Sequence, residues 1–244
     1  MTTQSYIGKG SVYIAKAGDP LVRIGNTSKL DFSIEEEKKE LMDYENPGGG
    51  VADSVTRIKG VKLALSVHKL SAENLATALR GASAVVAAGA VTDEAHANVQ
   101  VGGLVVFDKT PDTAIAYVVT DNAGTTTYTV GTDYIVRRAG LEIPAGSTIT
   151  DDSTIKVDYT ALAAVKVEAL TNVGEEVRLV FDGVNEANGK PMLVEAYRVK
   201  PGATKGWSLI GDDFATLEIE ADVLKDETIT GEGLSQYFKA RMAS

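Results

Sequence analysis

Apolar and polar residues alternate along the C-terminal third of the chain. Val177, Leu179 and Phe181 share one parity, and the charged residues Arg178 and Asp182 lie on the other. A period of two is typical of a strand with one buried face. The segment 217–220 alternates in the same way and predicts a second strand. The segment 191–197 is largely apolar on both faces and predicts a third strand, covered on both sides. The chain is therefore organised around a sheet whose strands lie within 175–227.

The N-terminal part predicts the strands that complete this sheet. Their apolar positions alternate over 10–17, 21–24, 29–35 and 57–68. One helix follows over 71–80, where Ser71 is a good N-cap and Gly81 supplies the stop. Its apolar stripe at helical spacing predicts a helix that lies on its own sheet.

Between residues 36 and 56 the alternation stops. Neither a strand period nor a helix period continues there, and connections of this length in compact domains are usually functional or disordered. Two extended arms of about ten residues each would project roughly 30 Å, off their own domain and onto a neighbour. The predicted inter-subunit contact residues lie in this connection: Glu37, Lys38, Lys39, Leu41, Met42, Tyr44, Pro47, Gly48, Gly49, Gly50 and Val51.

The middle of the chain predicts an inserted domain. Residues 82–97 and 161–164 are rich in alanine, and we interpret them as linkers. Six short candidate strands lie between them, separated by turns, which suggests a small sandwich or barrel. They cover 99–107, 115–120, 126–130, 134–136, 141–143 and 155–160.

The simplest division is thus a discontinuous β core, 1–83 and 165–244, interrupted by a small β domain over 84–164. On this division the first sheet resumes at 165–168. The rival division is one continuous domain with a long excursion. Overall, we expect a mainly β protein, an antiparallel sandwich or partial barrel with one flanking helix.

The C-terminal segment, 229–244, is short and punctuated by glycines. Such ends are commonly mobile unless they are docked. Leu234, Tyr237 and Phe238 are the side chains that we expect to dock on a partner.

Composition narrows the function classes. The 244 residues are 44% hydrophobic and 24% charged, as in an ordinary soluble globular protein. The net charge of −10 argues against a protein that grips nucleic acid by its phosphates. No cysteine is present, which excludes disulfides and thiolate metal sites. The segment 1–8 has no basic region followed by an apolar one, so we expect no signal peptide.

The candidate chemistry is sparse. His68 and His96 are the only histidines, and neither has the spacing of a metal site or a nucleophile–base pair. We place His68 on the polar side of a strand and His96 in a linker. The segment 183–191 has glycines but lacks the spacing of a phosphate loop. We expect no catalytic residue, no cofactor and no metal site.

The chain also carries two pairs of adjacent aspartates. Asp212 and Asp213 follow a glycine, and Asp151 and Asp152 lie in a similar turn. Adjacent residues of a strand point to opposite faces, and residues in turns more often cap the bend. A hydrolase would rest on these pairs alone.

Two segments carry a resemblance to a known family. Glu-Ala-Tyr-Arg-Val-Lys-Pro at 195–201 and Leu-Ile-Gly-Asp-Asp-Phe-Ala-Thr-Leu-Glu-Ile-Glu-Ala-Asp-Val-Leu at 209–224 resemble the major tail tube proteins of long-tailed bacteriophages. The order of the predicted elements is also similar, from the first strand pair through the long connection to the helix. The resemblance covers 1–83 and 165–228 and leaves the insertion outside it.

This resemblance implies a structural protein of the virion tail, assembled in the host cytoplasm. Its β-sandwich would form rings of copies, typically hexamers, stacked into a tube with sheets that join across subunits. The long connection would contact a neighbouring subunit, and DNA would pass through the channel without specific binding. Other tail proteins, such as a tape measure protein, would be partners. The alternative from another class is a β-sandwich binding module, such as a capsid decoration protein or an adhesin.

Overall fold

The computed structural model describes residues 5–243, so the first four residues of the N-terminal segment lie outside the described residues. Strands hold 53% of the chain and helix 3%, which confirms the mainly β class. The strand pairs of the three larger sheets are antiparallel. The chain divides into two compact units, and each is described by itself: unit 1 is 1–83 with 167–244, and unit 2 is 84–166.

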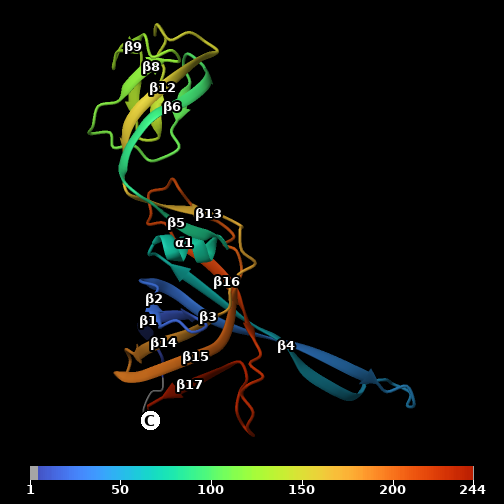
Figure 1. The fold of residues 1–244 in the computed structure, drawn as a ribbon. Helices are drawn as coiled ribbons and strands as arrows, with labels where there is room; N and C mark the ends of the chain where they lie inside the picture. Colours follow the sequence, from blue (N-terminus) through green and yellow to red (C-terminus); the bar gives the residue numbers. More distant parts are fainter. Residues whose placement is uncertain (1–4, 244) are drawn as a thin grey trace. The chain divides into compact units, whose positions relative to one another are not determined.

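Unit 1 is built on one eight-stranded sheet (Figure 1). The strand order is β2-β1-β14-β15-β16-β4-β3, and β17 also pairs with β15. The strands are β1 Gly8–Lys16, β2 Val22–Arg23, β3 Thr27–Met42, β4 Val51–Val67, β14 Val177–Asn185, β15 Lys190–Pro201, β16 Leu217–Leu224 and β17 Phe238–Met242. The three strands predicted within 175–227 are therefore the centre of the sheet.

Strand β15 pairs with two different strands along one of its edges. Its first half pairs with β17 from Met192 to Ala196, and its second half pairs with β16 from Arg198 to Pro201. The inward side chains of both halves then share one core, which includes Val12, Leu63, Leu179 and Leu217, each at most 2% exposed. Alternation along each strand fixes which side chains enter that core, because a slip of one residue would turn them all outward.

Helix α1, Ala72–Ala78, lies against this core as predicted. The Ser71 hydroxyl accepts a hydrogen bond from the Asn74 backbone N–H, so Ser71 is the N-cap. Asn74 is itself buried, and its Nδ2 donates to the carbonyl oxygens of Ile24 and Lys69 at 2.7 and 2.9 Å. These two bonds tie the helix to the segments on either side of the β3–β4 hairpin.

Unit 2 contains two small sheets around a second core. One sheet has the order β6-β12-β8-β9 and the other β10-β11-β7. Ile143, Ile155 and Val157 are completely buried between them. The strands are β6 Gly89–Val99, β7 Leu104–Val106, β8 Val118–Asp121, β9 Thr127–Tyr128, β10 Ile135–Arg137, β11 Gly140–Glu142 and β12 Ser153–Ala161.

The linker interpretation of 82–97 is wrong. Residues Ala82–Val86 form β5, and Gly89–Val99 form β6, which pairs with β12 from Gly89 to Val99. A segment of alanine, valine and small polar residues can form a strand when the paired strand supplies most of the apolar surface. The expectation that 165–168 resumes the first sheet is also wrong, because β13, Ala164–Glu168, pairs with β5 as a two-stranded ribbon.

Two further expectations are corrected. The connection over 36–56 is not irregular, since β3 continues to Met42 and β4 begins at Val51. The C-terminal side chains Tyr237 and Phe238 pack on the core of their own unit, whereas Leu234 is exposed. Strand β17 holds them there, so self-pairing has replaced the docking on a partner that we expected.

Candidate inter-subunit surface

The distal half of the β3–β4 hairpin, Glu36–Lys59, extends beyond the sheet and is called the arm (Figure 1). Pairing continues along it from Glu36 opposite Ile58 to Met42 opposite Val51. Every residue of its two strands is exposed, because no third strand or second layer covers it. A two-stranded hairpin alone is marginally stable in water, so the arm gains little stability from its own copy beyond its cross-strand pairing.

The tip of the arm is a defined turn. The Asp43 carboxylate accepts hydrogen bonds from the backbone N–H groups of Glu45 and Asn46 and from Asn46 Nδ2, at 2.8 to 3.2 Å. The Asn46 side chain and these backbone donors lower the pKa of Asp43 below its ordinary value. Gly48, Gly49 and Gly50 have φ angles of 115°, 66° and 138°. Only glycine adopts all three readily, so the glycine run fixes the reversal of the chain.

The structure brings every predicted contact residue onto this one hairpin. Glu37, Lys38, Lys39, Leu41 and Met42 lie on β3. Val51 begins β4, and the turn between the strands holds Tyr44, Pro47, Gly48, Gly49 and Gly50. That these residues contact a neighbouring subunit stays a prediction.

Sequence reasoning missed two apolar residues of the returning strand. Val55 and Ile58 are 50% and 56% exposed, beside Leu41 at 58% and Tyr44 at 85%. Val55 lies opposite Lys39, and Ile58 lies opposite Glu36. Cross-strand partners share a face, so apolar side chains occur on both faces of the arm. Large apolar side chains on both faces of an uncovered hairpin are the feature of the sequence that could have indicated a contact surface.

Ion pairs on the arm run along β3. Lys38 pairs with Glu40 at 2.6 Å and Lys39 with Glu37 at 4.0 Å. Within residues 5–243, this leaves Arg57 and Lys59 on β4 without an ion-pair partner. Both alternate with Ile58 along the strand and share the face of the exposed Val55, so this face of the arm presents apolar surface and positive charge together.

A second exposed apolar element is the β15–β16 connection, residues 202–216, which is called the apolar loop. Leu209, Ile210 and Phe214 are 74%, 96% and 94% exposed. Thr204 anchors its start, where its N–H donates to the Ala78 carbonyl and its hydroxyl to the Glu218 carbonyl. The sequence singled out this segment for its acidic pair and for the resemblance, and not for its exposed apolar residues. In the sequence, three large apolar residues lie next to Gly211 and an acidic pair. They do not alternate with polar residues as they would in a half-buried strand.

The acidic pairs have separate places. Asp212 and Asp213 are exposed on the apolar loop and, in the part of the chain that the structure describes, accept no hydrogen bond. Asp151 and Asp152 accept bonds from Val101 N–H and Gln100 Nε2, at 2.8 and 2.7 Å. The second pair therefore shapes a turn of unit 2. No group of three His, Cys, Asp or Glu side chains in the described residues can hold a metal ion.

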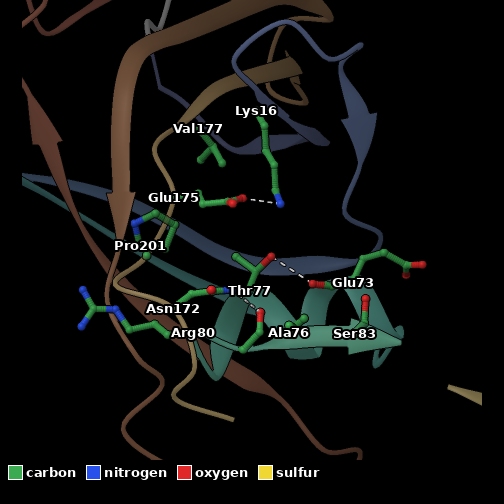
Figure 2. Close-up of a pocket in the computed structure, with 13 residues that line it drawn as sticks. Lys16, Glu73, Ala76, Thr77, Arg80, Ser83, Asn172, Glu175, Val177 and Pro201 are labelled. Carbon is green, nitrogen blue, oxygen red and sulfur yellow. Dashed lines mark hydrogen bonds and ion pairs between the residues drawn. The ribbon is translucent and has the colours of Figure 1, made fainter. Parts of the chain in front are cut away.

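A polar cleft of about 400 Å³ lies between α1, the end of β1 and the segment 172–177 (Figure 2). Its wall includes the Lys16–Glu175 ion pair. Asn172 Nδ2 donates to the Gly81 carbonyl at 2.9 Å, and the Thr77 hydroxyl donates to the Glu73 carbonyl. These polar groups are already paired with one another, and the lining residues present no nucleophile beside a base. The cleft gives weaker support for a function than the arm does.

The histidines differ from their predicted places. His68 follows the end of β4, and its backbone N–H donates to the Asn26 carbonyl at 2.9 Å. His96 lies within β6 rather than in a linker, stacked on Phe107. His96 Nε2 is 3.0 Å from Glu94 Oε1, although not in hydrogen-bonding geometry. The spacing of residues in the sequence could not reveal this environment, because Phe107 follows β7 and meets His96 of β6 only in the folded chain.

The Tyr159 hydroxyl completes that polar cluster of unit 2. It donates to Glu94 Oε2 at 2.6 Å and accepts from the Lys109 N–H at 3.2 Å. Burial and the bond to Glu94 raise the pKa of Tyr159 to about 12. The phenol therefore stays protonated at neutral pH and serves as a structural donor inside the unit.

Comparison with protein families assigns the chain as a whole. Residues 5–241 match the model of the family described as protein of unknown function UCP028589. The chain belongs to this family. The match spans both units, so the family includes the β core and the small β unit together. Comparison with curated proteins gives no match. No helix among the described residues is long and apolar enough to cross a membrane.

Proposed function

We propose that this protein is a structural subunit that assembles with its own copies into stacked rings, forming the tail tube of a long-tailed phage. The observation that carries the proposal is the arm. It projects from the sheet with exposed apolar side chains on both faces, including Leu41, Val55 and Ile58. The proposed kind of assembly, a tube of stacked rings, comes from the sequence resemblance to major tail tube proteins.

The edges of the sheet support self-association. Strand β3 ends the strand order, so its outer edge has no partner in unit 1. An exposed strand edge is a template for pairing with another chain, and closure into a ring removes such edges. In this proposal, the tube carries DNA through its channel without specific binding, and the tape measure protein and other tail proteins are its partners.

The test removes the arm without disturbing the sheet. Glu36 and Ile58 are cross-strand partners, so residues 37–57 can be replaced by Asn-Gly as a two-residue hairpin. Sedimentation velocity of the wild-type chain is expected to show large assemblies, and the deletion variant is expected to sediment as a folded monomer. A matched control, Ser54→Thr/Thr56→Ser, keeps the apolar residues and is expected to assemble. Unchanged assembly without the arm would refute its role.

Unit 2 favours a second candidate, a β-sandwich binding module such as a capsid decoration protein or an adhesin. This unit has its own core, and Val101, Leu104 and Val106 are exposed on it. A chain that stays monomeric at high concentration while unit 2 retains a cooperative fold would favour this candidate over the tube.

A further inference from the structure

The arm and the apolar loop lie at opposite ends of β4. The loop runs directly into β16, whose first residue, Leu217, pairs with Val67 at the end of β4. The arm begins at the other end of the shared pairing, where Val223 pairs with Val61. At about 3.3 Å per residue, Arg57 on the arm and the start of β16 are roughly 30 Å apart along the strand.

Within one copy, the arm does not cover the apolar side chains of the loop, and the loop does not cover those of the arm. Ile210 and Phe214 are more than 90% exposed. The start of the loop is held at the α1 end of the sheet by Thr204 and by the hydrogen bond from Gly202 N–H to the Glu220 carbonyl at 2.7 Å. The exposed apolar surface at each end therefore requires a partner from outside the subunit.

The two elements are complementary in charge as well as in polarity. The arm carries Arg57 and Lys59 on the face of the exposed Val55, and the loop carries Asp212 and Asp213 between Ile210 and Phe214. Within residues 5–243, none of these four charged side chains has an ion-pair partner. Complementary charges beside apolar contacts select partner and register more than they add affinity.

We infer that the arm of one copy docks on the apolar loop of a second copy, with Arg57 and Lys59 facing Asp212 and Asp213. This inference rests on the proposed self-assembly and names the surface that receives the arm. Because the two patches differ and lie at opposite ends of a strand, the contact is head-to-tail. A head-to-tail contact along the strand axis repeats without closing, so it stacks one layer of subunits on the next.

The test is a charge exchange read by sedimentation velocity at low ionic strength. Arg57→Glu/Lys59→Glu is expected to shift the chain from large assemblies to single layers or monomers, and so is Asp212→Lys/Asp213→Lys. The variant that combines both pairs is expected to recover assembly to within about twofold of wild type. The matched control, Lys109→Glu/Arg138→Glu on exposed residues of unit 2, is expected to assemble normally.

A second measurement locates the contact directly. The chain has no cysteine, so Val55→Cys and Ile210→Cys copies can be mixed and oxidised without background. A disulfide-linked heterodimer is expected, in excess over either homodimer. Assembly of the wild type combined with no rescue by the charge exchange, or with no heterodimer, overturns this inference and leaves the proposed function standing. A wild-type chain that remains monomeric overturns both.

Discussion

Phe32 on β3 and Phe238 on β17 stack with their ring centroids 4.9 Å apart. The two strands pair with different partners, β4 and β15, so this contact joins distant parts of the sheet. It fastens the C-terminal strand to the core of unit 1.

The first prediction concerns this fastening. Phe238→Ala is expected to lower the free energy of unfolding of unit 1 by roughly 2 kcal/mol. Removal of the half-buried ring leaves a cavity and takes away the stacking partner of Phe32. Urea denaturation followed by tryptophan fluorescence measures the change. Met242→Ala, on the same strand but 73% exposed, is the control and is expected to change stability by less than about 0.5 kcal/mol.

The second prediction concerns Glu195, which is 8% exposed between Arg178 and Lys239. Burial pushes its pKa upward, but the hydrogen bonds and charges of Lys239 and Arg178 together outweigh burial and hold the pKa below its ordinary value. A carboxyl with a lowered folded-state pKa stabilises above its unfolded pKa, about 4.3, and loses this contribution as pH falls through the folded value.

Glu195→Gln is therefore expected to cost roughly 1–2 kcal/mol at pH 7 and to show a smaller loss of stability than wild type between pH 6 and pH 3. Urea denaturation at each pH measures both effects. Glu218→Gln, an exposed carboxylate on β16, is the control and is expected to follow the wild-type pH profile. Parallel profiles for wild type and Glu195→Gln would contradict the assigned role of the buried carboxylate.

The third prediction concerns Asp133, a buried residue of unit 2. Its carboxylate accepts hydrogen bonds from the backbone N–H of Thr129 and from the N–H and hydroxyl of Thr148, at 2.8 to 3.0 Å. These donors lower its pKa. Asp133→Ala would leave them unpaired and is expected to destabilise unit 2 by roughly 2–3 kcal/mol. Asp108→Ala is the exposed control, and calorimetry that leaves the melting of unit 2 unchanged by Asp133→Ala would refute this assignment.

The fourth prediction concerns the independence of unit 1. All the residues of its core come from 1–83 and 167–244, and the chain enters and leaves unit 2 through the paired strands β5 and β13. Replacement of residues 84–166 by a short Gly-Ser linker is expected to leave a chain with β-rich circular dichroism and one cooperative urea transition. Loss of that transition would favour the rival division into a single continuous domain.

The sequence predicted strands wherever one face of the sheet is buried. Leu30 and Phe32 alternate with polar residues because their inward face meets a core. The same strand continues through the arm, where both faces are exposed and no burial imposes a period of two. The arm therefore looked like an irregular connection although its backbone pairing is regular.

Other features depended on contacts between distant segments. The burial of Glu195 requires cations from β14 and β17, and its own strand pattern suggested only a covered side chain. The pairing of β5 with β13 depends on two segments about 80 residues apart, one interpreted as a linker and the other as a strand of the first sheet. The apolar loop was missed because exposed apolar residues have no periodicity to detect.

The most direct test of the account is negative-stain electron microscopy of the purified full-length chain at increasing concentration. The account predicts rings and stacked tubes of uniform diameter, which disappear when residues 37–57 are replaced by Asn-Gly. Single particles of monomer size at every concentration, with the chain folded by circular dichroism, would contradict it.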